Sequence, residues 1–233
     1  MNHLRSAVLV LSLGGSMFAG INVASAAEPG QSAKAAPFCV DLSKYCTAQL
    51  TNSLNSPAHV AENDLASFPK GRQSFAGVPF QVDCVLQVSG KKLEEWGRKE
   101  FPKGIKVVEL NRSFSRIHLL HGAGGVYDSD GVTVGRLVLH YADKSEREIE
   151  IRNGVHVRDW WGDPTQAITD SNSSLAWTGT NPALKKYGGE KPGSLRIYKT
   201  TFQNPQPGVV VTSADFISAM NESSPFLLGL TVE

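Results

Sequence analysis

Short apolar runs separated by turn residues are the feature that most constrains how this chain can fold. The runs are rich in β-branched and aromatic residues, and none continues with the 3.6-residue period of a helix. Gly-Asp-Pro, Tyr-Gly-Gly and Asn-Pro-Gln-Pro-Gly lie between them and favour turns. No internal repeat is visible. The expected strands cover residues 80–88, 105–110, 114–121, 132–141, 146–151, 155–160, 175–178, 195–202, 209–216 and 226–232.

This pattern predicts an all-β fold, an antiparallel β-sandwich or jelly roll. Residues 132–141 and 146–151 should pair as a hairpin through the Ala142–Ser145 turn. The last strand is apolar on both faces and should lie inside a sheet. Residues 52–77 are rich in Ser, Asn, Pro and Gly, which predicts a long loop laid over the domain that could form one wall of a cleft.

The first 26 residues have the pattern of a secretory signal peptide. Arg5 precedes a short apolar run, and Ala24-Ser-Ala26 fits a cleavage site after Ala26 or Ala27. Residues 27–37 are small and polar and predict a flexible leader, which leaves 38–233 as a single β-sandwich domain. No stretch has the length of a membrane-spanning helix. We therefore expect a secreted or periplasmic protein without membrane insertion.

The balance of charges restricts the partners. Without the signal peptide, basic and acidic side chains are equal in number, 22 each. A neutral chain with no basic run is not typical of proteins that bind nucleic acid or anionic membranes.

Three cysteines in an exported chain suggest one disulfide and one free thiol. Cys39 and Cys46 are close in sequence, and the spacing predicts that they form the pair. Cys84 alternates in phase with Phe80 and Val82, so we interpret it as a small hydrophobic residue on a buried strand face.

Residues 149–161 contain the strongest candidate for a ligand site. If Trp160 and Trp161 are extended, their side chains point to opposite faces, so one ring faces the core and the other covers a second surface. A Trp ring can stack on a sugar while polar side chains bind its hydroxyls. This hypothesis assigns ligand binding to His156, Arg158, Asp159, Trp160 and Trp161. The alternative is a packed aromatic corner with Arg158 paired to a nearby acid.

Other polar clusters have two interpretations each. Asp128 and Asp130, in an Asp-x-Asp-Gly turn, could bind Ca²⁺, but Asp-Gly is also a common hairpin turn. His118 and His121 would face opposite sides of a strand, which favours structural roles over one shared metal. The alternative is a catalytic or ligand role for His121, at the end of the strand before Gly122. Trp177 is in phase with Leu175, which predicts a position in the core.

Seven short segments taken together resemble galactose-binding-like jelly-roll domains of secreted bacterial proteins. They are residues 40–43, 75–81, 118–123, 134–135, 141–143, 157–161 and 225–228. The resemblance implies a jelly-roll sandwich that binds carbohydrate. It assigns no catalytic residues to this chain. The three cysteines depart from the family's pattern.

Three functions follow as hypotheses. The first is a secreted, non-catalytic module that binds a carbohydrate or an envelope glycan. The second is a structural or protein-interaction module of the cell envelope. The third is a glycoside hydrolase that uses Asp159 and Asp163 as its acid pair, although the chain contains no specific catalytic motif.

Overall fold

The computed structural model describes residues 36–190 and 193–233. The predicted signal peptide and most of the predicted leader lie outside these residues. The strands are β1 Phe38–Cys39, β2 Gly71–Phe75, β3 Val78–Val82, β4 Leu86–Gln87, β5 Gly104–Arg112, β6 Arg116–Gly124, β7 Thr133–Tyr141, β8 Glu146–Arg152, β9 Trp161–Gly162, β10 Ser173–Gly179, β11 Ser194–Gln203, β12 Val211–Ser218 and β13 Ser224–Val232. Two short helices, α1 Lys91–Glu95 and α2 Pro182–Tyr187, and a 3-10 turn at Ser43–Tyr45 accompany them.

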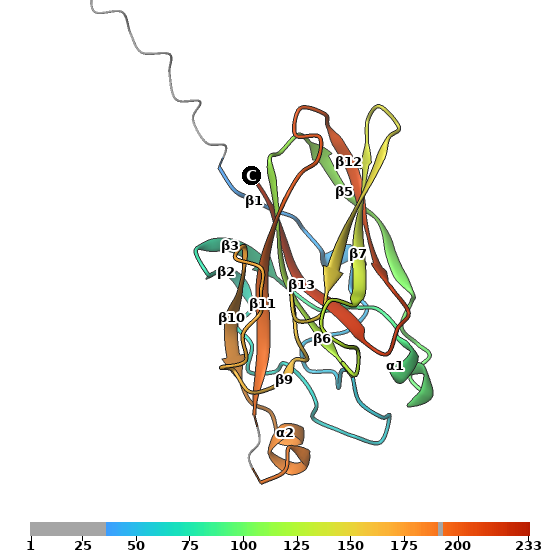
Figure 1. Ribbon diagram of the computed structural model, residues 1–233, viewed down its shortest axis with the longest axis vertical. Helices are drawn as coiled ribbons and strands as arrows, with labels where there is room; N and C mark the ends of the chain where they lie inside the picture. Colours follow the sequence, from blue (N-terminus) through green and yellow to red (C-terminus); the bar gives the residue numbers. More distant parts are fainter. Residues whose placement is uncertain (1–35, 191–192) are drawn as a thin grey trace, which may run out of the picture. The chain divides into compact units, whose positions relative to one another are not determined.

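Two antiparallel sheets pack face to face (Figure 1). The larger sheet has the order β1-β13-β6-β11-β10, with β4 beside β13 and β9 beside β11, and the smaller has the order β5-β12-β7-β8. Apolar side chains from both sheets, among them Leu119, Leu139 and Phe216, form the core between them. The predicted all-β sandwich is confirmed.

Strands β6 and β13 are buried on both faces because a second core lies behind the larger sheet. On β6, Leu119 belongs to the core between the sheets, whereas its neighbour Leu120 belongs to the second core. Residues 49–70 and the β2–β3 hairpin cover this second core. The segment 49–70 contributes four buried side chains to it, those of Leu50, Leu54, Leu65 and Phe68. The prediction of a long loop packed over the domain is confirmed for residues 52–70, whereas residues 71–75, expected in the same loop, form strand β2.

Two predictions about strand pairing are also confirmed. Strands β7 and β8 form the expected hairpin, closed by a bond from Tyr141 N to Ser145 O of 2.9 Å. Strand β13 lies inside its sheet, with β6 on one side and β1 and β4 on the other.

The prediction of a strand over residues 155–160 is wrong. The chain turns here and forms only isolated bridges, at Val157 and Asp159, and the next strand is β9. Gly154 has a φ of 71°, and the Asp159 carboxylate accepts a bond from the Trp161 N–H at 2.8 Å, which closes a local turn. In this segment, hydrogen bonds from side chains to the nearby backbone therefore take the place of the backbone hydrogen bonds of a continuous strand.

The position predicted for Trp177 also needs correction. The pairing of β10 with β11 shifts register between Leu175 and Trp177. A bulge of this kind breaks strict alternation. Leu175 consequently packs against the core between the sheets, while Trp177 packs against the second core, edge-on to Phe68 with ring centroids 4.8 Å apart.

The predicted Cys39–Cys46 disulfide is wrong. Cys46 is bonded to Cys84, with the Cα atoms 5.8 Å apart, and Cys39 is free. Ala48 forms a bridge with Val85, which brings Cys46 and Cys84 together, whereas Cys39 pairs with Thr231 on β13. Cys84 is buried as predicted, but as a disulfide partner.

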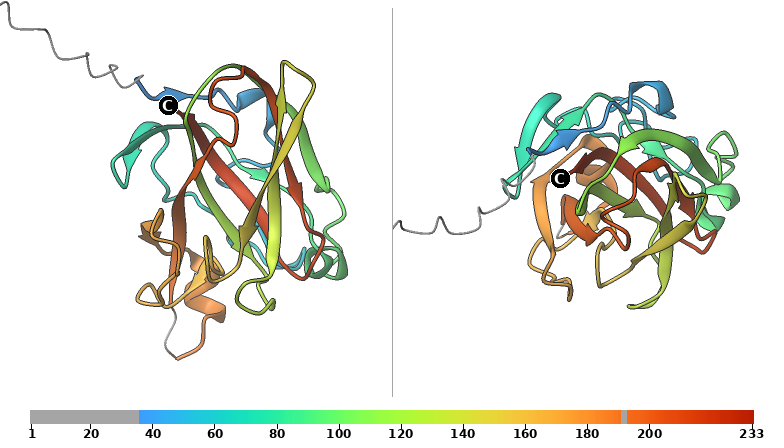
Figure 2. Two further views of the ribbon diagram at one scale, coloured as in Figure 1. Left: turned by 45° about the horizontal axis from the view of Figure 1, so that its top comes forward. Right: turned by 90° about the horizontal axis from the view of Figure 1, so that it is seen from above.

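Helices α1 and α2 lie at one end of the sandwich, with the loop that follows residue 49 between them (Figure 2). The C-terminus and β1 lie at the other end (Figure 1). None of the helices in residues 36–190 and 193–233 is both long and apolar enough to span a membrane.

Candidate functional site

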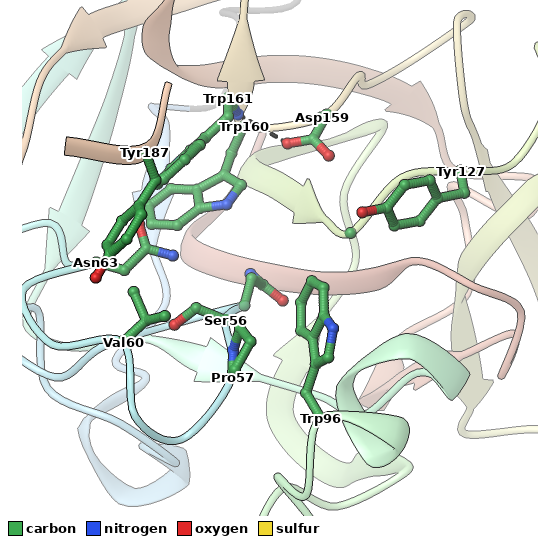
Figure 3. A pocket seen from close by; sticks show the side chains of 12 residues that line it. Ser56, Pro57, Val60, Asn63, Trp96, Tyr127, Asp159, Trp160, Trp161 and Tyr187 are labelled. Carbon is green, nitrogen blue, oxygen red and sulfur yellow. Dashed lines mark hydrogen bonds between the residues drawn. The ribbon is translucent and has the colours of Figure 1, made fainter. Parts of the chain in front are cut away.

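A cavity of about 230 Å³ opens between α1, α2 and the loop at this end of the sandwich. Segments far apart in the sequence meet around it (Figure 3). Its lining residues are Asn55, Ser56, Pro57, Val60, Asn63, Trp96, Gly125, Tyr127, Asp159, Trp160, Trp161 and Tyr187. We call it the aromatic cavity.

Aromatic side chains form the facing walls of the aromatic cavity. Trp161 and Tyr187 lie on one side, and Trp96 and Tyr127 lie on the other (Figure 3). Tyr127 and Tyr187 are 68% and 51% exposed, an unusual degree for large rings gathered at one opening. Exposed aromatic rings grouped around a concavity are typical of ligand sites.

The two adjacent tryptophans have different roles. Trp160 is buried in the second core and meets Phe226 edge-on, with ring centroids 5.7 Å apart. Trp161 is half-buried, and its ring is tilted by 40° from that of Trp160 at a centroid distance of 6.5 Å. Because the chain turns at Asp159, both rings contact the same core. The prediction that one ring is anchored inward is confirmed. The expectation that the other ring covers a second surface is wrong, because Trp161 packs against the same core and forms part of the cavity wall.

Arg196 fixes the backbone that carries these tryptophans. This β11 residue is 2% exposed, and its guanidinium donates to the carbonyls of Asp159 at 2.9 Å and Asp163 at 2.8 Å. A Cβ at Gly162 would lie 2.4 Å from the guanidinium, so only glycine allows this approach. In addition, Arg196 N–H donates to Trp160 O at 2.7 Å. These bonds hold the turn against β11.

The carboxyl group of Asp159 lies at the back of the aromatic cavity. Its Oδ1 accepts from Trp161 N–H at 2.8 Å, and its Oδ2 accepts from Val126 N–H at 2.9 Å. Burial raises the pKa of Asp159 to about 6, although these two bonds and the charge of Arg196 oppose the rise. The carboxyl group therefore changes its charge in the mildly acidic range.

Polar groups from the loop complete the cavity. The side-chain amides of Asn55 and Gln87 exchange bonds of 3.0 and 3.1 Å, and Asn63 Oδ1 accepts from Asn181 Nδ2 at 3.2 Å. Ser56 Oγ and Trp161 Nε1 are buried and bond no other group in the described part of the chain. Because these two atoms have almost no exposed surface, a ligand in the cavity would reach them only if side chains moved.

The structure separates the five predicted ligand residues. Asp159, Trp160 and Trp161 line the aromatic cavity, whereas His156 and Arg158 are not among its lining residues. His156 accepts from Arg152 N–H at 3.0 Å and packs edge-on against Phe202. Both Arg158 terminal nitrogens bond the Asp130 carboxylate at 3.0 Å. The interpretation of Arg158 as a structural ion pair is confirmed.

The predicted calcium turn has protein partners. Asp130 is paired with Arg158, and Asp128 Oδ2 accepts from Ser223 N–H at 3.0 Å. No cluster of three or more His, Cys, Asp or Glu side chains suited to a metal occurs in the described residues. The carboxylates thus tie the turn to Arg158 and to the chain before β13.

The two β6 histidines bond different β11 hydroxyls. His118 Nδ1 lies 2.9 Å from Thr201 Oγ1, and His121 Nε2 lies 2.9 Å from Thr200 Oγ1. Burial lowers the pKa of His121 to about 3, so this side chain is neutral. Adjacent threonines point to opposite faces of β11, so the histidines do not converge on one ion.

Three residues of the aromatic cavity were not predicted from the sequence: Trp96, Tyr127 and Tyr187. The Asn181-Pro182 pair is a typical helix start, and Asn181 Oδ1 accepts from Leu184 N–H at 2.7 Å. That signal could have predicted α2, which ends at Tyr187. Trp96 and Tyr127 follow α1 and β6, and no sequence pattern indicates that they approach each other.

Asp163 does not join Asp159 in the aromatic cavity. Its carboxylate accepts bonds from Thr165 N–H and Oγ1 at 2.8 and 2.7 Å, and Asp163 lines a second pocket, which shares Trp161 with the aromatic cavity. Glycosidases need two acids that flank one bond of the substrate. The aromatic cavity is lined by one carboxyl group.

The fold and the site define an antiparallel β-sandwich with an aromatic cavity at one end of its strands. The chain matches no protein-family model, no curated protein and no solved structure.

Proposed function

We propose that this protein is an exported, non-catalytic module that binds carbohydrate in the aromatic cavity. The observation that carries the proposal is the set of aromatic rings that converge on one small cavity from separate segments of the chain. Such rings offer flat apolar surfaces at fixed positions, which suits the apolar faces of sugar rings.

The size and polarity of the aromatic cavity support a sugar-sized ligand. Its volume of about 230 Å³ is below the roughly 300–1,000 Å³ of pockets for drug-sized molecules. The Asp159 carboxyl group and the phenolic hydroxyls of Tyr127 and Tyr187, which line the cavity, could bond sugar hydroxyls. One or two sugar units would therefore enter the cavity, and the rest of a glycan would extend outside it.

The proposal includes export from the cell, and it agrees with the resemblance to galactose-binding-like jelly rolls of secreted proteins. The predicted signal peptide would direct the chain to a secreted or periplasmic location. The Cys46–Cys84 disulfide is compatible with an oxidising compartment. A carbohydrate or envelope glycan is the partner expected there.

A glycan array and calorimetry test the proposal. The wild-type protein should bind a subset of glycans, and Trp161→Ala should weaken that binding by roughly tenfold or more through loss of stacking. Phe38→Ala is the matched control, because Phe38 is also a partly exposed aromatic residue but lines a different pocket near β1. Unchanged binding by Trp161→Ala would remove the site assignment.

The structural or protein-interaction module remains the alternative hypothesis, favoured by the packing of Trp160. It predicts that Trp160→Ala and Trp161→Ala both lower the melting temperature strongly and that no glycan binds. Under the carbohydrate proposal, the half-buried Trp161 contributes less to the free energy of unfolding than Trp160, whose loss should cost about 3–5 kcal/mol.

A further inference from the structure

Charge distinguishes the aromatic cavity from a neutral sugar platform. Of its twelve lining residues, none is Lys, Arg or His, and Asp159 is the one carboxylic acid. Four aromatic rings, those of Trp96, Tyr127, Trp161 and Tyr187, line the same cavity as this carboxyl group (Figure 3). Aromatic faces attract cations, and a carboxylate attracts them further.

We infer that the aromatic cavity selects a glycan whose sugar ring carries a protonated amine in place of a hydroxyl or acetamido group. The inference rests on the proposed carbohydrate function and names the class of sugar. The ammonium group would lie between the rings and the Asp159 carboxylate, with the sugar ring against Trp161.

Asp159 can accept further hydrogen bonds. An ionised carboxylate has about four lone-pair sites. The backbone N–H groups of Trp161 and Val126 occupy one on each oxygen. The remaining sites are available to an ammonium group, which has three donors. A sugar hydroxyl could use the same sites, but it lacks the charge that strengthens the bond.

The cations near the cavity leave this arrangement intact. Arg196 lowers the pKa of Asp159, but its guanidinium bonds the Asp159 carbonyl and lies outside the lining. Lys92 Nζ lies 5.4 Å from the Tyr127 ring centroid and is paired with Glu95 at 3.1 Å. Lys186 Nζ likewise lies 5.1 Å from the Tyr187 ring centroid, so two of the four rings already contact a cation. Among the described residues, Trp96 and Trp161 have no such partner, so these two rings would contact the ammonium group.

The remaining groups around Asp159 do not compete for the proton. Tyr198 on β11 interacts with the Asp159 charge, and burial raises the Tyr198 pKa, so this phenol is neutral. Arg158 is engaged by Asp130. Because burial raises the pKa of Asp159 to about 6, the carboxylate is present at pH 7 and is largely protonated at pH 5.

Calorimetry with three tetrasaccharides that share the same β-1,4-linked backbone tests the inference. They carry an amine, an acetamido group or a hydroxyl at carbon 2: de-N-acetylated chitotetraose, chitotetraose and cellotetraose. At pH 7 the wild-type protein should bind the amine form about tenfold more tightly than the other two. At pH 5 this preference should disappear. The sugar amine is more fully protonated at pH 5 than at pH 7. A loss of the preference at pH 5 can therefore come only from the protein.

Two variants assign the effect. Asp159→Asn should remove the preference, so that at pH 7 it binds the amine form no more tightly than the acetamido and hydroxyl forms. Asp143→Asn is the control, because Asp143 also accepts a bond from the N–H two residues later, at Ser145, but lies in the β7–β8 turn. If Asp159→Asn fails to fold, the wild-type pH series still decides the question.

The outcomes separate the inference from the proposed function. Equal affinity for the three sugars, a preference that persists at pH 5, or no binding of any of them would overturn the amine inference. Equal affinity would leave the carbohydrate proposal intact. The carbohydrate proposal fails separately, when the full glycan array gives no binding.

Discussion

Asp159 performs two tasks with one carboxyl group. Its bonds to the backbone of Trp161 and Val126 shape the turn and join it to the segment after β6. The same burial that makes these bonds possible raises its pKa to about 6. A residue that sequence analysis selected for its place beside two tryptophans thus also determines the charge of the aromatic cavity.

The raised pKa of Asp159 predicts a dependence of stability on pH. The folded state holds this proton more tightly than the unfolded state, so the stabilisation is complete below about pH 4 and is lost as the pH rises through about 6. Urea unfolding should show that the free-energy difference between wild type and Asp159→Asn decreases from pH 4 to pH 7.

Asp163→Asn provides the control with the opposite sign. Bonds from Thr165 lower the pKa of Asp163, so its contribution is present above the unfolded pKa and is lost as the pH falls. The difference between wild type and Asp163→Asn should therefore not decrease between pH 4 and pH 7. A parallel decrease in both variants would contradict the burial of Asp159.

At the scale of elements, the Cys46–Cys84 disulfide joins the segment before the loop of residues 49–70 to the turn between β3 and β4. It closes a loop over a sequence separation of 38 residues. Chain entropy predicts a loss of roughly 3–4 kcal/mol when such a crosslink is removed. Cys46→Ser/Cys84→Ser should unfold at correspondingly lower urea concentration, whereas Cys39→Ser should change little. An equal effect of both would contradict the Cys46–Cys84 pairing.

The approach of the loop to β6 depends on a glycine. A Cβ at Gly124 would lie 2.3 Å from Asn55 Cβ, so Gly124→Ala should push the loop away from the strand and widen the aromatic cavity. We expect lower thermal stability and weaker glycan binding by calorimetry. Gly208→Ala is the control, because nothing lies within 4 Å of its new Cβ. Full retention of stability and binding by Gly124→Ala would show that this contact is unimportant.

Element positions could be predicted from the sequence wherever alternation continued without interruption. The β7–β8 hairpin and the interior position of β13 follow from their apolar patterns. The pattern fails where one local event changes the direction of side chains. The bulge before Trp177 and the turn at Asp159 are two such events, and both depend on contacts with distant residues.

At the scale of the whole molecule, the sandwich brings together residues that the sequence separates. Asp159, Trp160 and Trp161 could be predicted as a site because they are adjacent. Trp96, Tyr127 and Tyr187 could not, because their approach depends on α1, α2 and the loop meeting at one end of the sheets. Likewise, the Cys46–Cys84 disulfide could not be predicted, because the bridge between Ala48 and Val85 is what brings the two cysteines together.

The central claim is that a glycan binds in the aromatic cavity, and the four tryptophan indole N–H signals in an NMR titration test it most directly. With a glycan selected on the array, the signals of Trp96 and Trp161 should shift saturably, whereas Trp177, which packs against Phe68 outside the cavity, should remain unchanged. Shifts confined to Trp177, or no shift of Trp96 and Trp161 at saturating glycan, would contradict the account.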